Sequence, residues 1–140
     1  MLAQRLADAV HFVEREPSLS GLALGFFGAS TGAAAALAAA VRLGDRIGAI
    51  VSRGGRPDLA GEALNRICTP TLLIVGGADY GVIELNEQAY ALLQGPKALE
   101  IVPGASHLFP EPGALDAVIA HATHWFERYL LGENAARPAS

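Results

Sequence analysis

The sequence predicts an α/β protein: a four-stranded, mostly parallel sheet flanked by helices. Three observations favour this class. Four short apolar runs have the length of buried strands, and segments suited to helices alternate with them along the chain. The 140 residues are 51% hydrophobic and only 17% charged, so the helices are expected to lie against a sheet rather than to stand alone in water.

The first half of the chain is expected to form two helices and two strands in alternation. Leu2–Val13 has apolar residues on one helical face, and Pro17 ends that helix. Leu22–Phe27 is an apolar run that we expect to form a strand buried on both faces. The alanine-rich segment Ala33–Leu43 favours a helix, and Ile47–Val51 a second buried strand.

The second half repeats this alternation. Asp58 can cap a short helix that reaches about Ile67, and the strand Thr71–Val75 follows. We expect a helix from Ile83 or Glu84 to Leu93, then a strand over Ala98–Val102 and a last helix over Pro112–Leu131. Parallel strands joined by helices require right-handed crossovers. Residues 1–131 are therefore predicted to form one domain, and residues 132–140 a flexible tail.

Composition argues against several classes of partner. The net charge is −4 and no basic stripe is present, which disfavours nucleic acid. The longest apolar run, Ala33–Val41, is too short to span a bilayer, so no membrane partner is expected. Arg5 and Asp8 interrupt the first residues, which lack the pattern of a signal peptide. Cys68 is the only cysteine and is interpreted as a small buried residue, and we expect a cytoplasmic protein.

The residues from Gly28 to Gly32 fit the pattern G-x-S-x-G between a predicted strand and a predicted helix. In that context the pattern indicates a nucleophile elbow, a strained turn that exposes the hydroxyl of Ser30. We expect only hydrogen side chains to fit at Gly28 and Gly32. An alternative is a glycine hinge in which Ser30 or Thr31 caps the helix. A phosphate-binding loop fits poorly, because its lysine is missing.

Two further polar residues follow later strands. Asp79 comes after the third predicted strand and His107 after the fourth, so both are expected at the same sheet edge as Ser30. Serine needs a base to become a nucleophile, imidazole can be that base, and a carboxylate orients the imidazole. Taken singly, Asp79 could be a helix cap and His107 a half-buried loop residue. Their joint placement, in the order Ser, Asp, His, favours a catalytic triad.

These residues carry a family resemblance. The chain resembles the α/β-hydrolase superfamily, most of all its dienelactone hydrolase-like branch, over nearly its whole length. The segments that carry the resemblance are FGASTGAAAAL from Phe27, PTLLIVGGAD from Pro70 and VPGASHLF from Val102. The resemblance implies that Ser30 is the nucleophile, Asp79 the acid and His107 the base, with the backbone N–H of Thr31 in the oxyanion hole.

The chain also departs from the family pattern. A complete member has about four strands and an oxyanion-hole loop before the elbow strand, whereas this sequence starts at the preceding helix. We therefore expect a truncated α/β-hydrolase fold whose second oxyanion donor is missing, which typically lowers the rate by about 10²–10³. Dienelactone hydrolase itself uses cysteine, so Ser30 points to ester-type hydrolysis instead. Relatives look like the hydrolase half of proteins fused to a phosphoribosyltransferase domain.

Other candidate ligand-binding residues are few. Arg53 and Arg56 follow the second predicted strand and could bind a substrate carboxylate or phosphate, or be solvated loop charges. His121 and His124 have metal-compatible spacing, but no third ligand is evident, so neither a metal nor another cofactor is expected.

Three functions remain open at this stage. The first is a serine hydrolase module that acts on a small ester, lactone or thioester through an acyl-enzyme. The second is an inactive hydrolase-like half-domain that serves association. The third is a small anion-binding α/β protein that uses the N-terminus of the helix after Ser30 together with Arg53. Because the strand over residues 22–27 lacks an earlier neighbour and carries no charge, its open edge predicts a homo-oligomer.

Overall fold

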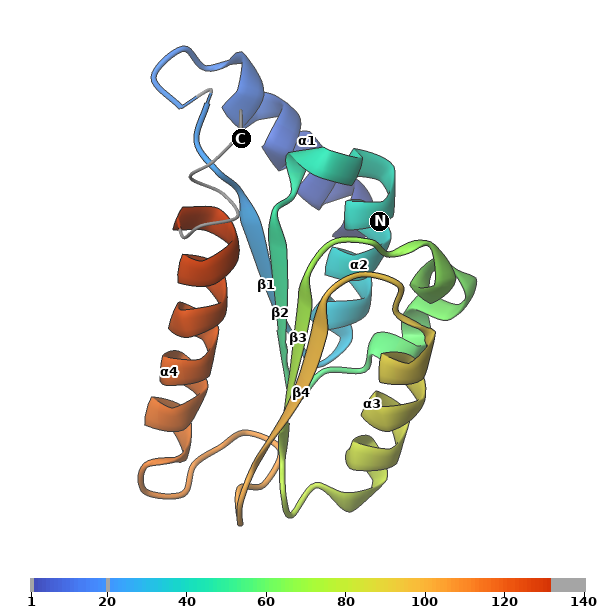
Figure 1. Ribbon diagram of the computed structural model, residues 1–140, viewed down its shortest axis with the longest axis vertical. Helices are drawn as coiled ribbons and strands as arrows, with labels where there is room; N and C mark the ends of the chain where they lie inside the picture. Colours follow the sequence, from blue (N-terminus) through green and yellow to red (C-terminus); the bar gives the residue numbers. More distant parts are fainter. Residues whose placement is uncertain (1, 20, 132–140) are drawn as a thin grey trace.

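The computed structural model describes residues 2–19 and 21–131 of the chain. Its centre is a parallel sheet in which each strand lies beside the next one in sequence (Figure 1). The strands are β1 (Gly25–Ala29), β2 (Ala49–Arg53), β3 (Thr71–Gly76) and β4 (Lys97–Val102). The predicted four-stranded α/β sheet is therefore confirmed. The tail predicted over residues 132–140 lies outside the described residues.

Helices cover both faces of the sheet (Figure 1). One face carries α1 (Leu2–Arg15), α2 (Thr31–Leu43) and α3 (Tyr80–Leu92). The other face carries α4 (Ala114–Phe126), which continues as the π-helix η3 (Glu127–Leu131). Among the described residues, no helix has the length and apolar character needed to cross a membrane.

Two apolar clusters fill the spaces between the sheet and these helices. Ile50 and Leu73 pack with Leu37 of α2 on one face of the sheet, and Val51 and Ile74 pack toward α4 on the other. Successive strand residues point to opposite faces, so a strand covered on both sides needs apolar residues throughout. This explains the apolar runs Ala49–Val51 in β2 and Leu72–Val75 in β3.

The first strand differs from its prediction. A strand is present, but it spans Gly25–Ala29 rather than Leu22–Phe27, and Leu22 is exposed. Phe26 is 8% exposed, whereas the next residue, Phe27, is 51% exposed, so the expected burial on both faces is wrong. The cause is position: β1 is an edge strand, and α4 packs mainly against β2, β3 and β4.

Smaller differences concern the loops after β2 and β3. Ser52 and Arg53, expected in a loop, complete strand β2. Asp58 does not cap an α-helix, because the segment forms 3-10 turns, η2 (Pro57–Arg66), interrupted at Gly61. Helix α3 begins at Tyr80, three residues before the expected start. Cys68 is exposed, so its interpretation as a buried residue is wrong.

Candidate active site

Ser30 occupies the turn between β1 and α2 in a strained backbone conformation. Its φ is 50° and its ψ is −126°, a region that costs a non-glycine residue on the order of 1–3 kcal/mol. Two backbone N–H groups hold its carbonyl oxygen, that of Arg56 at 3.0 Å and that of Ala33 at 3.2 Å. The Ser30 side chain makes no capping hydrogen bond to α2, so the alternative of a helix cap at Ser30 is wrong.

The two glycines of the turn have different roles. A Cβ at Gly28 would lie 2.7 Å from the Cα of Ala33, so only hydrogen fits there, as predicted. A Cβ at Gly32 would meet nothing within 4 Å, so the expectation that Gly32 is also sterically required is wrong. The space beside Gly32 is open because that residue lies in the exposed first turn of α2, next to Thr31.

Asp79 lies at the N-cap of α3 but does not act as its cap. Its side chain makes no capping hydrogen bond, and its Oδ2 lies 2.8 Å from Nδ1 of His107. The loops after β3 and β4 are joined at this point, because the N–H of Ala78 donates to the carbonyl of Ala105 at 2.9 Å. A Cβ at Gly76 would collide with that carbonyl. The close approach of the two loops brings the carboxylate to the imidazole.

His107 connects the other two side chains. Its Nε2 lies 2.9 Å from Oγ of Ser30, on the side of the ring opposite Asp79. A carboxylate can only accept, so Nδ1 donates to Asp79, and in the neutral ring Nε2 is left to accept the Ser30 hydroxyl proton. The His107 side chain is 40% exposed and that of Asp79 17% exposed. The structure thus joins Ser30, His107 and Asp79 in one chain of hydrogen bonds.

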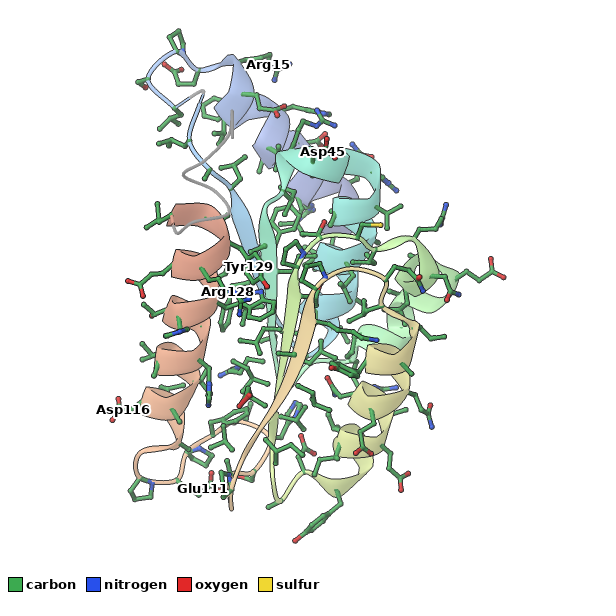
Figure 2. All side chains as sticks on the ribbon, viewed as in Figure 1. Arg15, Asp45, Glu111, Asp116, Arg128 and Tyr129 are labelled. Atoms are coloured by element: carbon green, nitrogen blue, oxygen red, sulfur yellow. The ribbon has the colours of Figure 1, made fainter. Side chains whose placement is uncertain are left out.

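Glu111 fixes the loop that carries His107, and it was missed from the sequence. Its two carboxylate oxygens accept from the N–H of Ser106 at 3.0 Å and from the Ser106 hydroxyl at 2.6 Å. These hydrogen bonds hold the pKa of Glu111 below its ordinary value. Figure 2 shows Glu111 in the loop between β4 and α4, at the lower end of the sheet in that view. The signal in the sequence that could have identified Glu111 is its position, four residues after the candidate base His107.

The two candidate arginines have different surroundings. Arg56 forms a two-point ion pair with Asp58, at 3.0 and 2.9 Å, which raises the pKa of Arg56 and lowers that of Asp58. Arg53 has no such partner among the described residues. Its Nε is buried without a hydrogen bond, and its guanidinium lies 5.8 Å from the ring centre of Phe109.

Thr31, the candidate oxyanion donor, is the first residue of α2 and is exposed. The first N–H groups of a helix have no acceptor within the helix. They also lie at the positive end of the helix dipole. A negative charge that develops beside Ser30 would therefore meet a favourable field.

The fold and this geometry define a class of protein. A strand, a strained turn with serine and a helix, followed by aspartate and histidine after later parallel strands, is the arrangement of the α/β hydrolases. The chain has the fold of that superfamily.

Comparison with solved structures makes the resemblance specific. The chain is 53% identical to a dienelactone hydrolase from Anabaena variabilis, with a TM-score of 0.90, over 91% of this chain and 59% of that one. An esterase domain from Rhodothermus marinus has the same fold, with a TM-score of 0.74 at 20% identity, over 91% of this chain and 69% of that one. The predicted similarity to dienelactone hydrolase is confirmed.

Curated relatives are considerably longer than this chain. A protein of Mycobacterium tuberculosis, found in strains CDC 1551 and H37Rv under the name "Putative phosphoribosyl transferase", is 51% identical over 132 residues. The match covers 94% of this chain and 30% of the relative. No family model matches the chain.

Proposed function

We propose that this chain is a serine hydrolase module that acts on a small ester, lactone or thioester. The observation that carries the proposal is the hydrogen-bonded series Ser30 Oγ, His107 Nε2 and Nδ1, and Asp79 Oδ2, with distances of 2.9 and 2.8 Å. The similarity to dienelactone hydrolase and to an esterase domain supports it.

The proposed reaction has two halves. His107 Nε2 takes the hydroxyl proton as Ser30 Oγ bonds to the substrate carbonyl carbon, and Asp79 stabilises the imidazolium that results. The tetrahedral intermediate collapses when the bond to the leaving alcohol or thiol breaks, and His107 returns the proton to that group. Water, deprotonated by His107, then attacks the acyl-serine, and the acid is released as Ser30 regains its proton.

Stabilisation of the oxyanion limits this reaction in the chain alone. The described residues offer the N–H of Thr31 and the end of α2 beside Ser30, and enzymes of this class use a second donor from an earlier loop. We therefore propose activity that is lower by about 10²–10³ than that of an intact hydrolase. The loss should appear in kcat more than in KM, because the donor acts mainly on the transition state.

Turnover of a p-nitrophenyl ester tests the proposal. We expect slow hydrolysis that Ser30→Ala abolishes, while Ser18→Ala, at an exposed serine between α1 and β1, leaves it unchanged. Hydrolysis that survives in Ser30→Ala would contradict the proposed nucleophile. Turnover near an ordinary enzyme rate, on the order of 10 s⁻¹, would contradict the proposed loss of an oxyanion donor.

Arg53 is the residue that we propose to bind an anionic group of the substrate. It lines a groove of about 380 Å³ with Phe27 and residues of α4, and no carboxylate of the described residues pairs with it. Its Cα lies opposite Ala29, the residue before Ser30, across the β1–β2 pair. Arg56 is less suited, because Asp58 already occupies its guanidinium. Binding of an anion without hydrolysis is the corresponding non-enzymatic function.

Association is the second candidate function. Within the described residues β1 pairs only with β2, and Phe27 and Leu22 expose large apolar side chains beside the open edge. An uncovered edge strand without charged residues is a template for pairing with another chain. We propose a homo-oligomer that uses this edge, in a cytoplasmic protein without nucleic-acid or membrane partners.

A further inference from the structure

The loop of Gly54, Gly55 and Arg56 contacts both reacting segments of the site. The N–H of Arg56 donates to the carbonyl of Ser30 at 3.0 Å. A Cβ at Gly54 would lie 3.0 Å from the carbonyl oxygen of His107 and 3.5 Å from its Nδ1. The position of this loop therefore affects the backbone of Ser30 and the space around His107 together.

The loop is closely packed and has little room for side chains. Gly54 and Gly55 are both buried, and Gly54 has a φ of +53°, a conformation that favours glycine. A Cβ at Gly55 would lie 2.6 Å from the Cβ of Ala33, so only glycine fits there. The N–H of Gly54 donates to the carbonyl of Ile74 at 2.8 Å, which fixes one end. The N–H of Arg56 bonds to Ser30 at the other end, and the carbonyl of Gly55 lies between these two bonds.

Asn86 of α3 contacts this carbonyl. Its side chain is fully buried, and its Nδ2 donates to the carbonyl of Gly55 at 3.1 Å and to that of Val82 at 2.9 Å. Burial of this amide costs free energy, because its Oδ1 has no hydrogen-bond partner among the described residues, and asparagine is a poor residue for a helix interior. An apolar residue would be the better choice if this position served packing alone.

The same helix carries the carboxylate of the site. Asp79 lies at the N-cap of α3, and Asn86 lies on its buried side, two turns further on. Helix α3 thus holds His107 through Asp79, and holds the carbonyl of Ser30 through Asn86, Gly55 and the N–H of Arg56. One rigid element links the two ends of the hydrogen-bonded series.

We propose that Asn86 is a positioning residue of this site. By holding Gly55, it places the N–H of Arg56 against the carbonyl of Ser30 and so keeps the strained serine within hydrogen-bond distance of His107. The inference rests on the proposed hydrolase function for its kinetic consequence, but its structural part concerns the Ser30 backbone alone.

Kinetics of Asn86→Leu give the first test, since leucine has the same branching and the same number of side-chain heavy atoms but cannot donate a hydrogen bond. We expect kcat for a p-nitrophenyl ester to fall about 10- to 100-fold, the range for one misplaced catalytic contact, while KM changes less than about threefold. Gln88→Leu, on the exposed side of the same helix, is the matched control and should leave both constants unchanged. Unchanged kcat in Asn86→Leu would overturn the proposal.

Amide hydrogen exchange gives a second readout that does not require activity. In Asn86→Leu the amide of Arg56 should exchange at least about tenfold faster, while the amide of Gly54, bonded to Ile74, keeps its protection. Equal loss at both amides would show a general loss of stability and overturn the proposal. Faster exchange at Arg56 alone, in a protein whose Ser30 proves unreactive, would refute the hydrolase function and leave the positioning role standing.

Discussion

The carboxylate of Asp79 lies 2.8 Å from Nδ1 of His107, although Asp79 occupies the N-cap of α3 and could have bonded the first N–H groups of that helix. The side chain thus forgoes a cap, a contact typically worth about 1 kcal/mol. It instead fixes the imidazole with Nε2 toward Ser30.

Asp79→Asn should preserve the fold and remove most of the activity. An amide can donate to Nδ1, which favours the tautomer with its proton on Nε2, where it cannot accept from Ser30. We expect kcat to fall by about 10³–10⁴, with KM little changed, in steady-state hydrolysis of a p-nitrophenyl ester. A variant with more than a tenth of the original kcat would show that Asp79 does not orient His107.

Glu111 should make the His107 loop sensitive to acid. Its pKa is lowered in the folded protein, so its stabilising effect is complete at neutral pH and is lost as the pH falls through the folded pKa, which lies below the ordinary value for a glutamate. Unfolding by urea between pH 6 and pH 3 should show a smaller acid-dependent loss of stability in Glu111→Gln than in the original chain. Glu62→Gln, at an exposed carboxylate with no side-chain partner among the described residues, is the control. Parallel pH profiles for Glu111→Gln and the original chain would contradict the role of the Ser106 contacts.

Arg53→Gln should change substrate preference rather than general activity. Two substrates are compared: mono-p-nitrophenyl adipate, which has a free carboxylate, and methyl p-nitrophenyl adipate, in which that carboxylate is a neutral methyl ester. The original chain is expected to have a kcat/KM about 10-fold or more higher for the first, since a charge-assisted hydrogen bond contributes about 1.5–3 kcal/mol. In Arg53→Gln this preference should vanish, measured as the ratio of kcat/KM values. Arg5→Gln removes the same charge from exposed α1 and should keep the preference. A ratio that Arg53→Gln leaves unchanged would exclude Arg53 from binding the anion.

Phe27→Lys should weaken self-association. The side chain is 51% exposed on edge strand β1, so a lysine is compatible with the fold but places a charge beside the open edge. Sedimentation velocity at micromolar concentration should show a dimer or larger species for the original chain and a shift toward monomer in the variant. A monomeric original chain whose β1 amides are strongly protected from exchange would contradict association through this edge.

Much of this arrangement follows from local sequence. Apolar runs bounded by glycine and proline located the four strands, and Ser30, Asp79 and His107 were identified because each follows the carboxyl end of a strand. The predicted limits of β1 were wrong because an apolar run does not show which of its residues pair with a neighbouring strand or pack under a helix. Leu22 and Phe27 are apolar, yet both are exposed. Asn86 was missed for a different reason, since its partner Gly55 is 31 residues away and no spacing rule connects them.

Labelling with a fluorophosphonate, located by mass spectrometry of the peptides, tests the central claim most directly. The reagent reacts with a serine hydroxyl only where a base activates it. We predict that the label is found on Ser30, that it disappears in Ser30→Ala, and that its rate of formation falls sharply in His107→Gln. A label on a different serine, with Ser30 unmodified in a folded chain, would contradict the assignment of Ser30 as the nucleophile.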